Sequence, residues 1–183
     1  MRRMGWLASG SVCAVFCFAL ALAAFARRGV PTLSSDQVVH RLIGEDREVR
    51  DALDERLGTT DRAEIAAVVF ANPDQLAWLE ALLHPRVRRV QEEWLAGLDA
   101  EVAVTEIPLL FEIGGEDRFD AVVVITAPDD VRAERTTRAR DARAARLIPD
   151  AEKVRRADFA YVNDGTLDEL DAFVGQVLDR LTE

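Results

Sequence analysis

The fold is decided by "EVAVTEIPLLFE", Glu101 to Glu112, together with "AVVVITAP", Ala121 to Pro128, which follows shortly after it. Both runs are short, apolar and rich in β-branched residues. Runs of this kind are typical of strands that are buried on both faces of a parallel sheet. The two stretches therefore predict neighbouring strands of a parallel sheet.

Strand and helix signals alternate on either side of these runs. Val30 to Leu33, opened by a glycine, and Phe159 to Val162 are further short strands. Thr166 with Glu169 three residues later predicts the cap of a last amphipathic helix, which runs through Leu181. Strands that alternate with helices in this way predict an α/β fold with a three-layer parallel sheet.

The stretch from Arg47 to Leu98 shows helical periodicity only and predicts an all-helical insert. Asp61 with Glu64, and Asn72 before Pro73, are helix start signals. An apolar face follows the second signal and comprises Leu76, Leu79, Leu82 and Leu83. The run "LLHPRVRR", Leu82 to Arg89, predicts that one helix ends at His84 and that the next opens at Pro85.

Composition indicates one globular unit and limits its partners. The 183 residues are 49% hydrophobic and 31% charged, which is enough for a single domain with a core. The net charge of −10 and the pI near 4.8 oppose binding to nucleic acid and to anionic membrane surfaces. The only cysteines are Cys13 and Cys17. We therefore expect no disulfide scaffold in the body of the protein and a reducing, cytoplasmic location.

Polar residues that follow the predicted strands are candidates for a ligand site, because ligands of open parallel sheets bind beyond the carboxyl ends of the strands. Three places qualify: Ser35 and Asp36, Glu106 with the residues after it, and Asn163 to Gly165. Asp36 has an ordinary alternative as a helix cap. No residue is singled out as a metal ligand.

Arginines form two further groups with the chemistry to hold phosphate. Guanidinium groups bind phosphate bidentately, so Arg86, Arg88 and Arg89 at a helix start are one candidate group. Arg135, Arg138 and Arg146 fall within an arc of roughly 80° of a predicted helix and form the other. A solvated face, paired with Glu134 and Asp141, is the alternative for the second group.

Five blocks stand in a characteristic order along the chain. They are "ALAAFARRGVPTLSSDQVVH", "DRAEIAAVVFANPDQLAWLEALLHPRVR" with its "HP", "EIPLLFE", "RAERTTRARDARAARLIPDAEKVRRAD" and the terminal "NDG". In this order the chain resembles the dephospho-coenzyme A kinases, a family of P-loop kinases, from about Ala21 to the C-terminus. The resemblance implies a single domain over residues 1–183, with an atypical segment 1–20, a helical substrate subdomain 47–98 and an arginine-rich lid 129–150.

The resemblance also implies transfer of the ATP γ-phosphate to the ribose 3′-hydroxyl of dephospho-coenzyme A, with Mg²⁺. Asp36 matches the second Asp of the family's "DAD", whose first Asp is Ser34 here, and would accept the hydroxyl proton. Arg138 and Arg146 would lie nearest the transferring group. Substrate contacts are implied for Arg62, His84, Arg88, Glu106, Pro108 and Leu109, and nucleotide contacts for Asn163 and Gly165. Glu106 stands where a carboxylate could lie near magnesium. No nucleic-acid partner and no stable membrane contact are expected.

The family's loop G-x-x-G-x-G-K-[ST], whose amides and lysine hold the phosphates, is absent. Counting back from "ALAAFARRG" puts Val15 to Leu20 in its place, with Phe18 where the lysine belongs. The single lysine of the chain is Lys153. As written, the chain is therefore expected to bind ATP poorly and to turn over slowly or not at all.

Three explanations remain for the opening stretch. The uncharged run from Met4 to Ala26 is long enough to span a bilayer as a signal anchor. Alternatively the chain is a pseudokinase that keeps the fold without the nucleotide loop. The third explanation is a shifted reading frame or start site, so that residues before about Leu20 are not the ancestral sequence.

Overall fold

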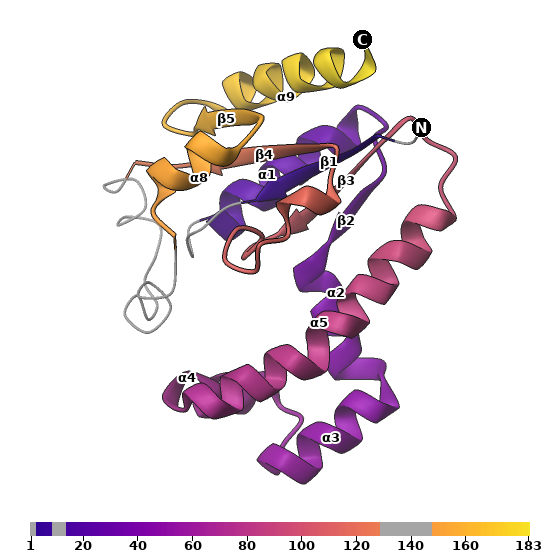
Figure 1. Ribbon diagram of the computed structural model, residues 1–183, viewed down its shortest axis with the longest axis vertical. Helices are drawn as coiled ribbons and strands as arrows, with labels where there is room; N and C mark the ends of the chain where they lie inside the picture. The colour runs from indigo at the N-terminus through magenta and orange to yellow at the C-terminus, as the bar shows by residue number, and fades with distance from the viewer. Residues whose placement is uncertain (1–2, 9–13, 129–147) are drawn as a thin grey trace. The chain divides into compact units, whose positions relative to one another are not determined.

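A computed structural model describes residues 3–8, 14–128 and 148–183, with side chains from residue 19 onward within those ranges. The described strands form one sheet in the order β2-β3-β1-β4-β5, and every neighbouring pair is parallel (Figure 1). They are β1 (Arg3–Ala8), β2 (Thr32–Ser34), β3 (Val102–Ile107), β4 (Ala121–Thr126) and β5 (Phe159–Val162). The parallel sheet is confirmed, and β3 and β4 are buried along nearly their whole length, as their composition predicts.

The central strand, β1, was not predicted. It pairs with β3 on one side and β4 on the other. Helix α1 (Ala14–Arg27) follows, so the uncharged run divides between a strand and a helix. Among the described residues, no helix is long and apolar enough to cross a membrane. Apolar composition alone does not distinguish a buried strand and helix from a membrane span, because all of them need apolar side chains.

The place assigned to the missing loop is also corrected. Val15 to Leu20 lie within α1 and not in the connection between β1 and α1. That connection is residues 9–13, which lie outside the described part of the chain. The counting failed because "ALAAFARRG" fixes only the end of α1. The helix has no sequence signal that marks its start.

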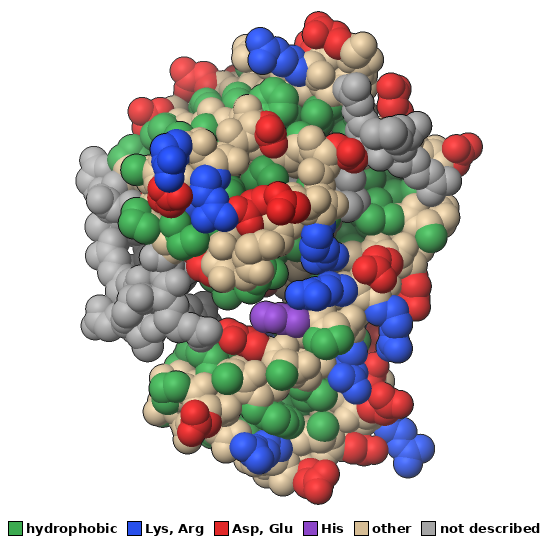
Figure 2. Space-filling model, viewed as in Figure 1, with side chains coloured by type: hydrophobic (Ala, Val, Ile, Leu, Met, Phe, Trp, Pro, Cys, Tyr) green, Lys and Arg blue, Asp and Glu red, His purple; other side chains and the backbone are tan. Residues whose placement is uncertain are grey.

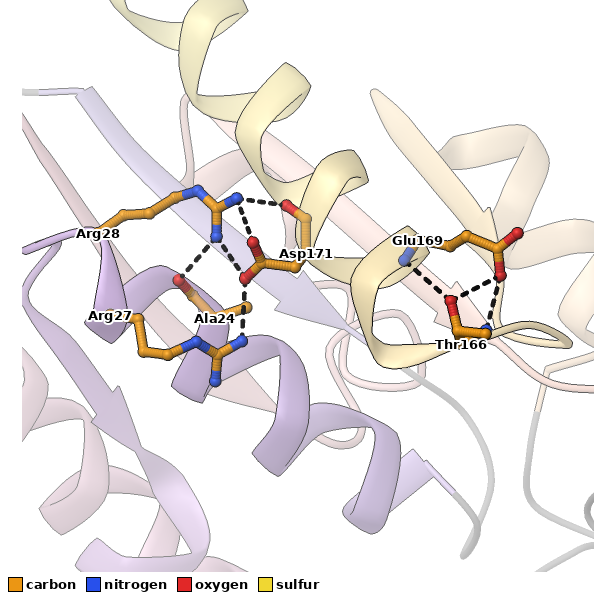
Figure 3. A network of polar contacts seen from close by, with 6 residues as sticks. All are labelled: Ala24, Arg27, Arg28, Thr166, Glu169 and Asp171. Carbon is orange, nitrogen blue, oxygen red and sulfur yellow. Dashed lines mark hydrogen bonds and ion pairs between the residues drawn. The ribbon is translucent and has the colours of Figure 1, made fainter.

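One face of the sheet is covered by α1 and α9 (Leu167–Thr182), which pack against each other. Phe25 of α1, Val104 and Val123 of the sheet and Val174 of α9 belong to the same buried core. Polar contacts join the two helices at the surface (Figure 3). Asp171 accepts hydrogen bonds from Arg27 at 2.9 Å and from both terminal nitrogens of Arg28 at 2.5 Å.

A second core contains Val122 and Val124 of β4 together with Leu110 and Phe111, which follow β3. The short helix η1 (Glu116–Arg118) lies between β3 and β4 in the chain, and α8 (Asp150–Arg156) contacts β4. Arg156 of α8 pairs with Glu116, and its guanidinium carbon lies 5.0 Å from the centre of the Phe111 ring. These contacts attach α8 to the segment that follows β3.

The residues from Ser35 to Leu98 form a second compact unit that is entirely helical. It comprises α2 (Ser35–Glu45), α3 (Arg47–Leu57), α4 (Arg62–Ala71) and α5 (Pro73–Ala96). The predicted insert started at Arg47, whereas this unit includes α2. Asp61 caps α4 and Asn72 caps α5 through their side-chain oxygens, as the start signals predict.

The predicted helix boundary at His84 and Pro85 is wrong, because α5 continues through Pro85 without a break. A proline inside a helix removes one backbone hydrogen bond and disturbs the carbonyls of the preceding turn. In the same turn the guanidinium of Arg86 donates to the Leu82 carbonyl at 2.9 Å. Arg86, Arg88 and Arg89 therefore lie inside a helix and not at a helix start.

Candidate active site

Buried polar side chains gather at the carboxyl ends of the strands. Ser34 ends β2, Thr105 and Glu106 stand near the end of β3, and Asn163 directly follows β5, all of them buried. Buried polar groups need partners that satisfy them, so these side chains are held in defined positions at the strand ends. The expectation that the strand ends carry the site is consistent with this distribution.

Glu106 differs from its predicted position, because β3 extends through Ile107 and includes it. Its backbone lies in register with Ser34 of β2 and Leu7 of β1, and only 3% of the residue is exposed. Strand alternation puts Glu106 on the same face as Val104, which belongs to the core beneath α1 and α9.

Pro108 and Leu109 lie in the turn that follows β3, and both are half-buried. The turn continues to Gly114, whose φ of +60° suits glycine. The Gly115 amide donates to the Leu110 carbonyl at 2.9 Å and closes the turn. The structure thus holds Pro108 and Leu109 directly beyond Glu106.

Asn163 and Gly165 lie beyond the neighbouring pair of strands, β4 and β5. The Asn163 amide donates to the carbonyl of Thr126, the last residue of β4, at 2.7 Å. Gly165 precedes a capping box in which Thr166 and Glu169 exchange hydrogen bonds (Figure 3). A Cβ on Gly165 would come within 2.0 Å of the Glu169 carboxylate. A glycine at this position is therefore explained by the packing of the capping box, without any contact to a ligand.

Asp36 is the second residue of α2 and is exposed. Because the helix begins at Ser35, Asp36 lies inside the first turn and not at the N-cap position that the capping interpretation gave it. The N-terminal turn of a helix favours a negative charge, since its free amides carry partial positive charge. Asp36 thus stays exposed in the first turn, directly beyond the end of β2.

Arg62 contacts a residue that the sequence did not single out. Its Nη1 lies 2.6 Å from Nδ1 of His40, and both side chains are exposed. Because a guanidinium only donates, Nδ1 of His40 is the acceptor in this contact. His40 follows Asp36 by four residues and therefore shares its side of α2, a spacing that could have indicated it.

His84 and Arg88 stand one turn apart in α5. His84 is half-buried, and burial lowers its pKa, with a further lowering from Arg88 that Glu80 opposes. The imidazole is therefore neutral at neutral pH. Arg88 is exposed, and no hydrogen bond or ion pair to it is found in the part of the chain that the structure describes. On the face shown in Figure 2, acidic and basic side chains are interspersed over the helical unit.

The run "AEKVRRAD" has a structural part in the fold. Lys153 lies 2.6 Å from Glu112 and is fully buried. The Asp158 carboxylate accepts from the Val122 amide at 2.7 Å, and its own amide donates to the Val122 carbonyl at 3.0 Å. Lys153 and Asp158 thus attach this part of the chain to the segment after β3 and to β4, respectively.

Arg138 and Arg146 lie outside the described residues, so the predicted helix and arginine face are not part of this description. Within the described ranges, no group of three or more His, Cys, Asp or Glu side chains is arranged to hold a metal. A magnesium ion bound with a nucleotide needs few protein ligands, since phosphates and water supply the rest. A single buried carboxylate such as Glu106 is compatible with that kind of site.

The fold and the buried polar residues at the strand ends indicate the class of protein. The chain resembles a solved protein of Thermus thermophilus with a TM-score of 0.80 and 31% identity, covering 100% of this chain and 99% of that one. It also resembles a dephospho-CoA kinase from Campylobacter jejuni with a TM-score of 0.69, 23% identity and coverage of 99% and 98%. A shikimate kinase from Aquifex aeolicus shares the fold with a TM-score of 0.55 and 13% identity, covering 97% of each chain. The protein therefore has the α/β fold of the P-loop kinases.

Sequence comparison identifies the family within that class. The family model for dephospho-CoA kinase matches residues 18–169. A dephospho-CoA kinase of Rhodopseudomonas palustris is 37% identical over 171 residues, covering 85% of each chain, and one of Brucella melitensis is 35% identical over 172 residues, covering 86% of each. The chain belongs to the dephospho-CoA kinase family. The match begins at residue 18, close to the point where the sequence blocks begin.

Proposed function

We propose that this chain is a phosphotransferase that moves the γ-phosphate of ATP to the ribose 3′-hydroxyl of dephospho-coenzyme A, the last step of coenzyme A synthesis. The observation that carries the proposal is the family match over residues 18–169. The buried polar residues at the strand ends support it, because the reaction needs a preorganised polar site.

Asp36 is the proposed general base. It is exposed in the first turn of α2, where a substrate hydroxyl can reach it. Ser34 stands where the family's "DAD" has its first Asp, so Asp36 is the only carboxylate at the two Asp positions of that motif. A base acts on the proton of the attacking hydroxyl, so Asp36 would contribute to the chemical step more than to affinity.

Arg62, His84 and Arg88 are the proposed contacts to dephospho-coenzyme A, with Pro108 and Leu109 lining its site. Arg88 supports this role best, because it is an exposed cation with no partner among the described residues and the substrate is an anion. The neutral, half-buried His84 suits hydrogen bonding more than charge pairing.

Asn163 and Gly165 are proposed to contact the nucleotide, and Glu106 to lie near its magnesium ion. ATP supplies the phosphoryl group, and Mg²⁺ neutralises the charge that develops on it. Glu106 fits this part because it is a buried carboxylate near the carboxyl end of a strand.

Arg138 and Arg146 are proposed to stabilise the transferring phosphoryl group as part of an arginine-rich lid over a three-layer sheet. Positioning and charge stabilisation supply most of the rate in phosphoryl transfer. Both residues lie outside the described ranges, so this assignment depends on the family resemblance of the segment and on its arginine content.

We further propose that turnover by this chain is reduced. The chain has one lysine, and its ammonium is paired with Glu112 in the interior. No other lysine can take the position of the phosphate-binding one. This observation favours a second candidate function, a non-catalytic protein that binds coenzyme A or a partner.

A coupled ADP-release assay with ATP, Mg²⁺ and dephospho-coenzyme A separates the two functions. Turnover that depends on dephospho-coenzyme A, with coenzyme A formed in equal amount, supports the kinase. A folded chain that binds dephospho-coenzyme A in calorimetry without releasing ADP supports the binder. Cell fractionation with a carbonate wash tests the membrane-anchored alternative, which predicts that the protein stays with the membrane.

A further inference from the structure

The side chain of Gln91 in α5 is buried in an unfavourable way. Only 2% of the residue is exposed, and its Nε2 donates to the Ser35 hydroxyl at 3.1 Å. No donor reaches its Oε1 among the described residues. A buried amide with one unsatisfied end is unfavourable, and an apolar side chain of similar size would avoid that cost. Packing of the helical unit alone therefore does not favour glutamine here.

The hydrogen bond from Gln91 fixes the start of another helix. Ser35 is the first residue of α2, and Asp36 is the second. The first turn of a helix is prone to open, because its amides lack partners within the helix. A buried hydrogen bond to Ser35 holds this turn in place while leaving the neighbouring Asp36 exposed.

The same helix carries the proposed substrate contacts. His84, Arg88 and Gln91 follow one another by four and three residues, so they fall within an arc of about 60° around α5. Helices α2 and α5 pack against each other within the helical unit. Gln91 thus connects the helix that bears Arg88 directly to the turn that bears Asp36.

We infer that Gln91 is a positioning residue for Asp36, holding the carboxylate at a fixed distance from the substrate contacts on α5. The inference deepens the proposed function and rests on it for the role of Asp36. In such sites a displacement of about 1 Å can cost up to 100-fold in rate.

The test compares the full-length chain with Gln91→Leu and Ser35→Ala, which remove the two ends of the hydrogen bond. Each should lower kcat about tenfold or more and leave the KM for dephospho-coenzyme A within about twofold. The kcat of the double variant should be no lower than that of either single variant. Ser35→Thr keeps a hydroxyl and should retain most of the activity. Leu53→Ala, a core substitution in α3 of the same unit, is the control for lost stability and should leave kcat unchanged at temperatures where the chain is folded.

A second measurement does not depend on turnover. The amides of Val39 and His40 donate to the carbonyls of Ser35 and Asp36 in helix geometry, so their hydrogen exchange reports on the first turn of α2. Gln91→Leu should speed their exchange at least tenfold relative to the amides of α3 and α4. Unchanged exchange, or equal acceleration throughout residues 35–98, would overturn the inference. A wild-type chain without turnover would contradict the proposed function, and the exchange measurement would still decide whether Gln91 holds this turn.

Discussion

The ammonium of Lys153 lies 2.6 Å from Oε1 of Glu112, with 0% of the lysine side chain and 11% of the glutamate side chain exposed. The contact is a close ion pair without hydrogen-bond geometry at Nζ. Oε1 of Glu112 also accepts from the Ile148 amide at 3.1 Å. The only lysine of the chain thus stabilises the attachment of α8 to the segment after β3, in a position where it cannot bind a nucleotide.

Breaking this pair should destabilise the fold. Lys153→Ala leaves the Glu112 carboxylate buried without its partner and should lower the free energy of unfolding by about 3–5 kcal/mol in urea denaturation. The double variant Lys153→Met with Glu112→Gln removes both charges and keeps an acceptor for Ile148. It should be more stable than Lys153→Ala. Equal losses in both variants would contradict this account of the pair.

Asp171 should give the fold a dependence on acidic pH. Hydrogen bonds from Arg28, and then from Arg27, lower its pKa from 3.8 to about 2. A lowered carboxyl pKa stabilises the folded chain above the unfolded value, and this contribution disappears as the pH falls from about 4 to 2. Asp171→Asn should therefore be less stable than wild type at pH 5, with the difference shrinking towards pH 2 in thermal melts. Asp54→Asn, a control at an exposed position of α3, should show no stability difference from wild type that shrinks in this way towards pH 2.

Asp36→Asn should abolish whatever turnover the chain has. The proposed base acts in the chemical step, so the affinity for dephospho-coenzyme A should remain nearly unchanged in calorimetry. Undiminished kcat in the variant would remove Asp36 from this role. A loss of affinity with normal kcat would make it a substrate contact instead.

Arg88→Ala and Arg138→Ala should have opposite kinetic signatures. Loss of Arg88 removes a charged contact to the substrate and should weaken binding of dephospho-coenzyme A about tenfold or more, with a smaller effect on kcat. Loss of Arg138 should lower kcat about 100-fold with little change in affinity, if the group acts on the transferring phosphoryl. Identical effects of the two substitutions would contradict the division of roles between them.

The reading-frame explanation of the opening stretch can be tested on the DNA. Translation of the nucleotides before the Ala21 codon in the other two frames should give a short strand-like run and a glycine-rich segment that ends in Gly-Lys-Ser or Gly-Lys-Thr. The helix that carries "ALAAFARRG" would then have a phosphate-binding loop at its N-terminus. If neither frame encodes such a segment, the reading-frame explanation is wrong, and the pseudokinase and the membrane-anchored protein are the explanations that remain.

The sequence by itself determined the parallel α/β class and the starts of several helices. Runs of β-branched residues predict β3 and β4, because a strand buried on both faces needs apolar side chains throughout. The caps at Asp61, Asn72 and Thr166 follow from hydrogen bonds between residues two or three apart. Local signals of this kind require no tertiary partner.

Tertiary structure decided what depends on contacts between distant segments. Arg3–Ala8 becomes the central strand because β3 and β4 pair with it on its two sides. The contacts of Gln91 with Ser35, of Arg62 with His40 and of Lys153 with Glu112 join residues 22 to 56 positions apart. No periodicity or spacing predicts such pairs, because only the folded backbone brings their atoms within hydrogen-bonding or ion-pairing distance.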